Sequence, residues 1–289
     1  MTWQLLLTAY LLLNTAVYLF QRKLGQSLAE HRRLVTGFFF LVIHYPIGLL
    51  VAYFLSPNLS IGWLNLFILL GVSWVFPLTI ILALRASKDV DAGHFTVLSN
   101  LTPIVTIVAA TLLLHESLAG RQLLGAAIII VSAFVITLPN LRHHDKTKAP
   151  ALMIALTVFV LTGLSIVYER WMLSRIDLGA YLVFGMGAQT FWMALMAWPE
   201  RKHLKILKSK KHFPKILGFA LASSIKGICF VSALKLSGNA SIVSAFISFT
   251  SILVVISAYF ILKEKEWLWL KISAAVMGTA GLIILNTNL

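Results

Sequence analysis

The sequence predicts an all-α polytopic membrane protein, with ten transmembrane helices arranged as two five-helix halves of inverted topology. Three observations predict this fold class. Of the 289 residues, 59% are hydrophobic and only 12% are charged, about half the charged fraction of soluble domains. The apolar residues gather in runs of about 20, the length that a helix needs to cross a bilayer. The two halves of the chain also share landmarks in the same order.

The apolar runs define the expected helices in chain order. They do not alternate apolar and polar residues as barrel strands do, so helices are expected. The first run lacks a basic leader and a cleavage site, so we expect a retained helix rather than a signal peptide. The expected spans are residues 3–20, 34–55, 62–85, 91–114, 119–138, 150–171, 178–198, 213–236, 240–262 and 266–286.

The chain divides into two expected repeats, residues 1–140 and residues 150–289, joined by a basic linker at residues 141–149. Because each repeat has an odd number of helices, the second must enter the membrane in the opposite direction. The matching landmarks recur 148 to 150 positions apart. They are Ala83-Leu84-Arg85 with Ala233-Leu234-Lys235, Glu116 with Glu264, and Phe20-Gln21-Arg22 with Tyr168-Glu169-Arg170.

The distribution of basic residues predicts the orientation, because short loops rich in Lys and Arg stay in the cytoplasm. Of the 24 Lys and Arg residues, 18 lie in connections on one side, and only Arg121, Arg170, Arg175 and Lys235 lie on the other. This bias predicts a multi-pass protein of the cell (inner) membrane with both termini outside the cytoplasm. The net charge of +14 is dispersed between the apolar runs, so we expect the lipid bilayer, and no nucleic acid, as a partner.

A series of short motifs follows the third run. Ala83-Leu84-Arg85 is followed by Leu101-Thr102-Pro103, then by Leu113-Leu114-His115-Glu116, and then by Gln122-Leu123-Leu124-Gly125-Ala126. This order resembles the EamA-type repeat of the drug/metabolite transporter (DMT) superfamily, and the second half carries a degenerate version. The resemblance implies ten helices around a central cavity and movement of metabolites by alternating access. It also implies cytoplasmic termini, opposite to the prediction from loop charge.

Two ionisable residues near the middle of apolar runs are the strongest candidates for a substrate site, because such residues are costly in a membrane. Lys226 either faces a cavity, where it binds an anionic group or releases a proton, or pairs with a buried carbonyl or acid. His44 either binds substrate or shuttles a proton, or is a neutral histidine hydrogen-bonded between helices.

The other candidate substrate-binding residues are polar or aromatic side chains within the runs. They are Asn14, Tyr45, Trp74, Asn100, Tyr168 and Gln189. Near Asn100, Pro103 frees backbone carbonyls that either line a cavity or only mark a packing kink. The acids, Glu169 among them, are placed at the ends of the runs, and Glu116 and Glu264 are assigned to helix-end structure or gating. With basic groups and no acid at mid-depth, the sequence predicts an anionic or zwitterionic substrate.

Three function classes remain open. The leading one is a secondary transporter of a small metabolite, coupled to protons or to exchange of a second solute. The second is a flippase for a lipid-linked anionic or sugar-phosphate headgroup, which needs a lateral opening. The third is an intramembrane transferase, which needs convergent acids. We find no HExxH, G-x-S-x-G or Walker motif, and Cys229 is the single cysteine, so we expect no enzymatic activity, metal or cofactor.

Overall fold

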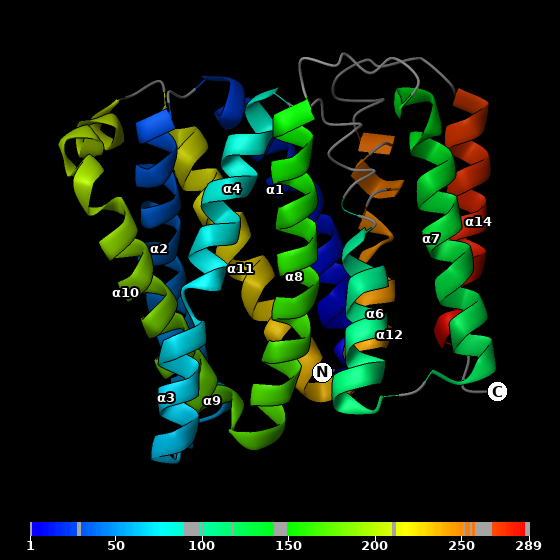
Figure 1. Ribbon diagram of the computed structural model, residues 1–289, viewed down its shortest axis with the longest axis horizontal. Helices are drawn as coiled ribbons and strands as arrows, with labels where there is room; N and C mark the ends of the chain where they lie inside the picture. The colour runs from blue at the N-terminus through cyan, green and yellow to red at the C-terminus, as the bar shows by residue number, and fades with distance from the viewer. Residues whose placement is uncertain are drawn as a thin grey trace. The chain divides into compact units, whose positions relative to one another are not determined.

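The computed structural model describes residues 2–27, 30–89, 99, 101–116, 118–141, 149–209, 212–250, 252–254, 256–257 and 268–286. Every regular element within these ranges is a helix. Figure 1 shows these helices coloured along the chain. They divide into two compact units. Unit 1 comprises residues 1–88 and 168–236, and unit 2 comprises residues 89–167 and 237–289. Each unit therefore combines segments from both expected repeats, and the repeat boundaries at residues 140 and 150 stay a prediction.

Unit 1 contains most of the described helices and the end of α8 (Ala149–Arg175). Two elements depart from α-helical geometry, the π-helix η2 and the 3₁₀-helix η3. The elements of unit 1 are α1 (Trp3–Ser27), α2 (Glu30–Leu55), α3 (Trp63–Val72), α4 (Val75–Asp89), α9 (Leu178–Ala180), η2 (Tyr181–Gly185), α10 (Met186–Ala197), η3 (Trp198–Lys208) and α11 (Phe213–Ser237).

The core of unit 1 forms where α2 meets α10, η3 and α11. α10 and η3 both pack against α2, and Leu41, Met193, Ile206 and Phe219 belong to one buried apolar cluster. Between membrane helices such side chains hold the helices together through van der Waals packing. This cluster therefore fixes α2 and α11, the helices that carry His44 and Lys226, within one packed body.

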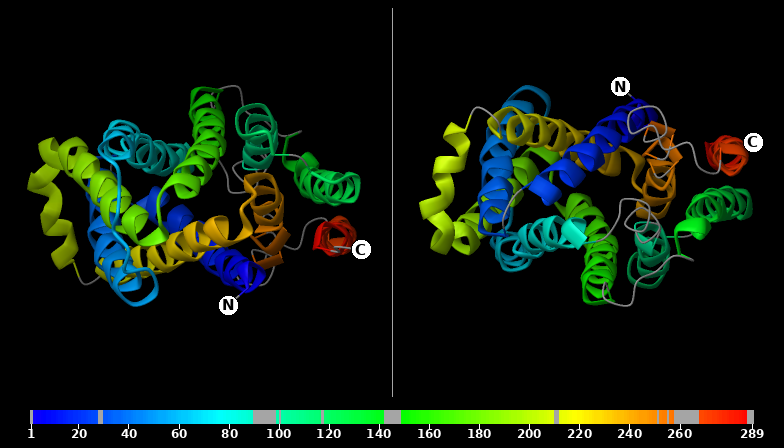
Figure 2. Two further views of the ribbon diagram at one scale, coloured as in Figure 1. Left: turned by 90° about the horizontal axis from the view of Figure 1, so that it is seen from below. Right: turned by 90° about the horizontal axis from the view of Figure 1, so that it is seen from above.

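Unit 2 contains α6 (Leu101–Leu114), α7 (Gly120–Leu141), α12 (Ala240–Ile247), α14 (Leu268–Asn286) and most of α8. α14 runs beside α7 in both views of Figure 2, and α12 packs against α6. The Thr102 and Thr106 hydroxyls each donate, at 3.2 Å, to carbonyl oxygens of α8, those of Phe159 and Gly163. The polar groups around the proline in α6 thus serve to join helices within this unit.

Six helical stretches are long and apolar enough to cross a membrane. They are Trp3–Gln21, Leu34–Phe54, Trp63–Ala86, Met153–Arg175, Leu178–Ile206 and Phe213–Ser237. The total of ten transmembrane helices stays a prediction, because the expected runs 91–114 and 240–262 extend into residues outside the described ranges. The expected run 62–85 is broken by a turn at Ser73 and Trp74.

Two charged motif residues hold helix ends. The Glu116 carboxylate accepts hydrogen bonds from the first amides of α12, Ala240 at 2.7 Å and Ser241 at 3.4 Å, where the helix dipole favours a negative charge. Lys235 Nζ donates to the carbonyl oxygens of Leu173 at 2.6 Å and Ile176 at 2.9 Å, at the end of α8. Of the two roles expected for Glu116, the geometry supports helix-end structure. Glu264 lies outside the described residues.

His115 directly follows α6 with a φ of 53°, in the left-handed region that favours glycine. A non-glycine residue there carries about 1–2 kcal/mol of backbone strain. We therefore expect His115→Gly to raise the midpoint of thermal unfolding in detergent by a few degrees. His115→Ala, which keeps the strain, should not raise it. An equal rise for both variants would contradict the backbone explanation.

Candidate functional site

Lys226 lies 13 residues after the start and 11 residues before the end of α11 and is partly buried within unit 1. Its ammonium group donates to the Asn14 side-chain oxygen of α1 at 3.2 Å. It also lies 5.8 Å from the ring centroid of Tyr10, one helical turn before Asn14, within the range of a cation–π interaction. The cation is thus held by one amide oxygen and one aromatic face, both from α1.

His44 of α2 is buried, with only 3% of its surface exposed. It hydrogen-bonds the Ser224 backbone and interacts electrostatically with Lys226. The imidazole lies against Gly227, where a Cβ would come within 2.8 Å of its Cε1 atom. Only a glycine at this position lets α11 approach the ring so closely. The three predicted residues Asn14, His44 and Lys226 therefore come together from three helices.

Two polar atoms near this group are buried without a hydrogen-bond partner among the described residues. They are Nδ1 of His44 and the hydroxyl of Ser223, which lies three residues before Lys226 on α11. Leaving a buried polar atom unsatisfied costs about 1–3 kcal/mol. The unsatisfied atoms therefore favour a site at which a water or a polar solute binds.

The expectation that the acids lie at the ends of the apolar runs is wrong for Glu169. α8 continues to Arg175, so Glu169 is more than one turn inside the helix, and only 8% of its surface is exposed. Its carboxylate accepts a hydrogen bond from the Tyr181 hydroxyl of η2, and Tyr181 also hydrogen-bonds Gln189 of α10. Among the described residues, no cation forms an ion pair with Glu169.

Glu169 and Lys226 both lie in unit 1, and both interact with Tyr10. Glu169 interacts electrostatically with Tyr10, the residue whose ring faces Lys226. Chemically, unit 1 thus offers a cation hydrogen-bonded to one amide oxygen, and a carboxylate hydrogen-bonded to one hydroxyl group. Among the described residues, no three His, Cys, Asp or Glu side chains are placed to hold a metal ion.

The other predicted residues lie outside these contacts or outside the described ranges. Tyr45 is partly buried and packs with Leu182 and Met186. Tyr168 donates to the Ile68 carbonyl at 3.4 Å. Trp74 is 41% exposed at the turn between α3 and α4. Asn100 lies outside the described residues. A substrate contact stays a prediction for these four residues, and equally for Asn14, His44, Gln189 and Lys226.

Sequence reasoning missed Tyr10, Glu169 and Tyr181 as members of this group. Tyr10 lies four residues before Asn14, so both are on one helix face. An apolar run drawn to Arg175 would have placed Glu169 inside it. The role of Tyr181 depends on the π-helix η2, a feature frequent at functional sites, and the local sequence YLVFG carries no signal for it.

The comparisons with known proteins concern the first half most directly. Residues 1–138 match the EamA-like transporter family. This match confirms the resemblance read from the motifs between Ala83 and Ala126, and it relates the chain to multi-pass membrane transporters.

Solved structures match nearly the whole chain at the level of the fold. In the comparison with solved structures, 28 chains match this chain. One, a crystal structure of another protein, has a TM-score of 0.70 with 14% sequence identity, over 98% of this chain and 96% of that chain. At this identity the similarity shows the fold alone. Among curated proteins, none matches the sequence.

We expect Tyr181→Phe to lower stability by about 1–3 kcal/mol, because it removes a hydrogen-bond donor from the buried Glu169 carboxylate. Glu169→Gln should lessen this cost, so the double variant should lose less than the sum of the single losses. Thermal unfolding of the purified protein in detergent measures all three variants. Tyr53→Phe, which removes the hydroxyl of an exposed tyrosine, is the matched control and should change little. Strictly additive losses would argue against the Tyr181–Glu169 contact.

Proposed function

We propose that this chain, whose first 138 residues match the EamA-like transporter family, is a secondary transporter of a small anionic or zwitterionic metabolite. In this proposal ten helices form two inverted five-helix repeats, and the substrate crosses by alternating access. The driving force is a proton gradient or exchange of a second solute. The inverted repeat provides two alternative packings of similar energy, the usual basis of alternating access.

The observation that carries the proposal is the contact of Lys226 with Asn14 beside His44. A lysine in the middle of an apolar helix is costly and is rarely retained without a role. Its partner Asn14 is a neutral amide, so the positive charge is not cancelled within this pair. An anionic group of a substrate would supply the missing negative charge.

Glu169 favours a zwitterionic substrate over a simple anion. Its carboxylate is buried and hydrogen-bonded to Tyr181, which in turn hydrogen-bonds Gln189, and no cation is ion-paired with it among the described residues. A substrate carrying both an amino and a carboxylate group would satisfy both Glu169 and Lys226. A substrate with only negative groups would leave Glu169 unpaired. An amino-acid-like solute therefore fits the two charges best.

The direct test of this substrate class is uptake into proteoliposomes that contain the purified full chain. The solutes are amino acids, dicarboxylates, organic cations and lipid-linked sugars, each tested with and without a pH gradient. We expect uptake of a zwitterion or an anion. Transport of organic cations alone would overturn the substrate class, and movement of lipid-linked sugars alone would favour a flippase.

Lys226→Ala should lower the initial rate of uptake at least tenfold. A hydrogen bond to a charged group contributes about 1.5–3 kcal/mol, and each 1.4 kcal/mol corresponds to a factor of ten. Lys226→Arg, which keeps the charge, should retain part of the activity. Lys215→Ala removes a lysine from the first turn of the same helix and should transport normally. Normal transport by Lys226→Ala would refute the role of this lysine.

A further inference from the structure

η3 is a basic helix that directly follows α10 and packs against α2. A 3₁₀-helix has three residues per turn, so residues three positions apart lie in one column on its surface, about 6 Å from one another. The segment WPERKHLKILK separates into three such columns. The three columns differ in the chemistry of their side chains and in how far those side chains are buried.

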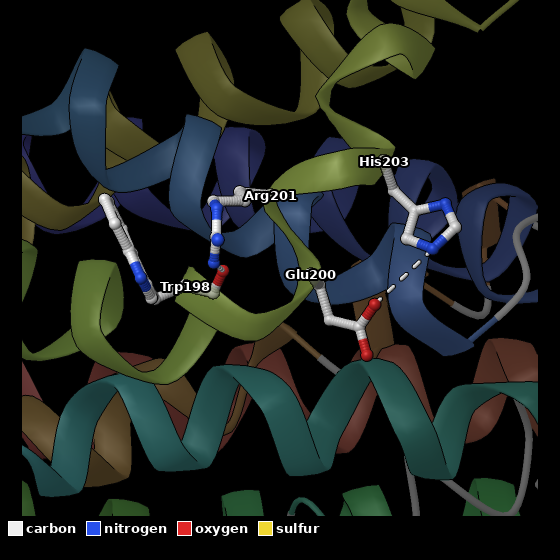
Figure 3. A network of polar contacts seen from close by, with 4 residues as sticks. All are labelled: Trp198, Glu200, Arg201 and His203. Atoms are coloured by element: carbon white, nitrogen blue, oxygen red, sulfur yellow. Dashed lines mark hydrogen bonds and ion pairs between the residues drawn. The ribbon is translucent and has the colours of Figure 1, made fainter.

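The first column faces the protein. It contains Glu200, His203 and Ile206. Ile206 is buried in the apolar core of unit 1. Glu200 and His203 are half-buried, and the His203 Nε2 atom lies 3.5 Å from the Glu200 Oε2 atom (Figure 3). This column attaches η3 to the rest of unit 1, and it turns the other two columns outward.

The second column is cationic and the third is amphipathic. Lys202 and Lys205 are both exposed, one turn apart. In the third column Trp198 and Leu204 are 64% and 40% exposed. Arg201 lies between them, with its guanidinium 5.0 Å from the Trp198 ring centroid and donating to the Trp198 carbonyl at 3.3 Å (Figure 3). Apolar and aromatic groups thus lie directly beside exposed positive charges.

This arrangement matches the chemistry of a membrane surface. Tryptophan lies at the level of the lipid headgroups because its ring is apolar and its N–H is polar. A helix with apolar groups beside basic groups lies in the interface plane and is attracted to anionic lipids. η3 begins where α10 ends, and Arg201, Lys202 and Lys205 lie in the last part of the candidate span Leu178–Ile206. Its place along the chain therefore suits the headgroup region.

We propose that the outer face of η3, formed by Trp198, Arg201, Lys202, Leu204 and Lys205, binds the headgroups of anionic phospholipids. The two lysines contact the phosphates. Trp198 and Leu204 enter the boundary with the acyl chains, and the ring of Trp198 holds the Arg201 guanidinium beside them. Anionic lipids are concentrated in the cytoplasmic leaflet, on the side where the loop charges place this segment. The surface is independent of the solute that the protein carries.

The test titrates the purified full chain in a non-ionic detergent with phosphatidylglycerol, and with phosphatidylcholine of the same acyl chains. Native mass spectrometry counts the bound lipids. We expect wild-type protein to bind phosphatidylglycerol in preference. Each lysine near the lipid surface is worth about fivefold in affinity, so Lys202→Gln with Lys205→Gln should weaken phosphatidylglycerol binding about 25-fold. Binding of phosphatidylcholine should stay unchanged.

Two controls separate the lipid site from a general effect of charge. Lys202→Arg with Lys205→Arg should keep the preference for phosphatidylglycerol. Arg175→Gln removes another exposed arginine that lies over a tryptophan, 4.1 Å from the Trp171 ring centroid, and should also keep it. The proposal is overturned if the glutamine pair binds phosphatidylglycerol as wild type does, or if Arg175→Gln weakens binding equally. It is also overturned if the glutamine pair changes the oligomeric mass and leaves the lipid count unchanged.

Discussion

The hydrogen bond between Lys226 and Asn14 links a charge in the middle of α11 to α1. A membrane helix carries such a charge only if neighbouring groups compensate for it. The described contacts in unit 1 meet this need in part, because they are an amide oxygen and an aromatic ring rather than a carboxylate. The Tyr10 ring faces the ammonium group, and Gly227 leaves room for His44 close to α11. The core of Leu41, Met193 and Phe219 holds α2, α10 and α11 together around this contact.

Glu169 is a buried acidic residue in the same unit as Lys226. Its contacts depend on Tyr181, which lies in the π-helical segment η2. A π-helical turn changes the direction of the side chains that follow it, and such turns are frequent at functional sites. The two charged residues have contacts on different helices. Lys226 links α11 to α1, and Glu169 of α8 contacts η2, which in turn contacts α10. A solute with both charge signs could therefore engage elements that lie far apart in the sequence.

Much of this account was accessible from the sequence. Apolar length predicted the positions of the long helices, and the cost of burying a charge singled out Lys226 and His44. Asn14 followed because it is one of the few polar residues in the first run. Glu169 was misplaced because an apolar run does not show where its helix ends, and α8 extends to Arg175. The roles of Tyr181 and Gly227 could not be predicted, because they arise from contacts between segments distant in the chain. The 3₁₀ geometry of η3 was also not predicted, although side chains of similar chemistry, such as Lys202 and Lys205, lie three positions apart in its sequence.

The central claim is that the polar group around Lys226 is reached by water and solute, and this can be measured by cysteine reactivity. In a Cys229→Ser background, Ser223→Cys places a thiol in the buried group, and Ile225→Cys places one on the exposed face of the same helix. Only the thiolate reacts, so a cysteine facing hydrocarbon is inert. Because Ile225 is on the exposed side of a membrane helix, its cysteine should face lipid. In membrane vesicles, we expect a small polar thiol reagent to label Ser223→Cys at least tenfold faster than Ile225→Cys. Equal and slow labelling at both positions would contradict the claim that solute reaches this site.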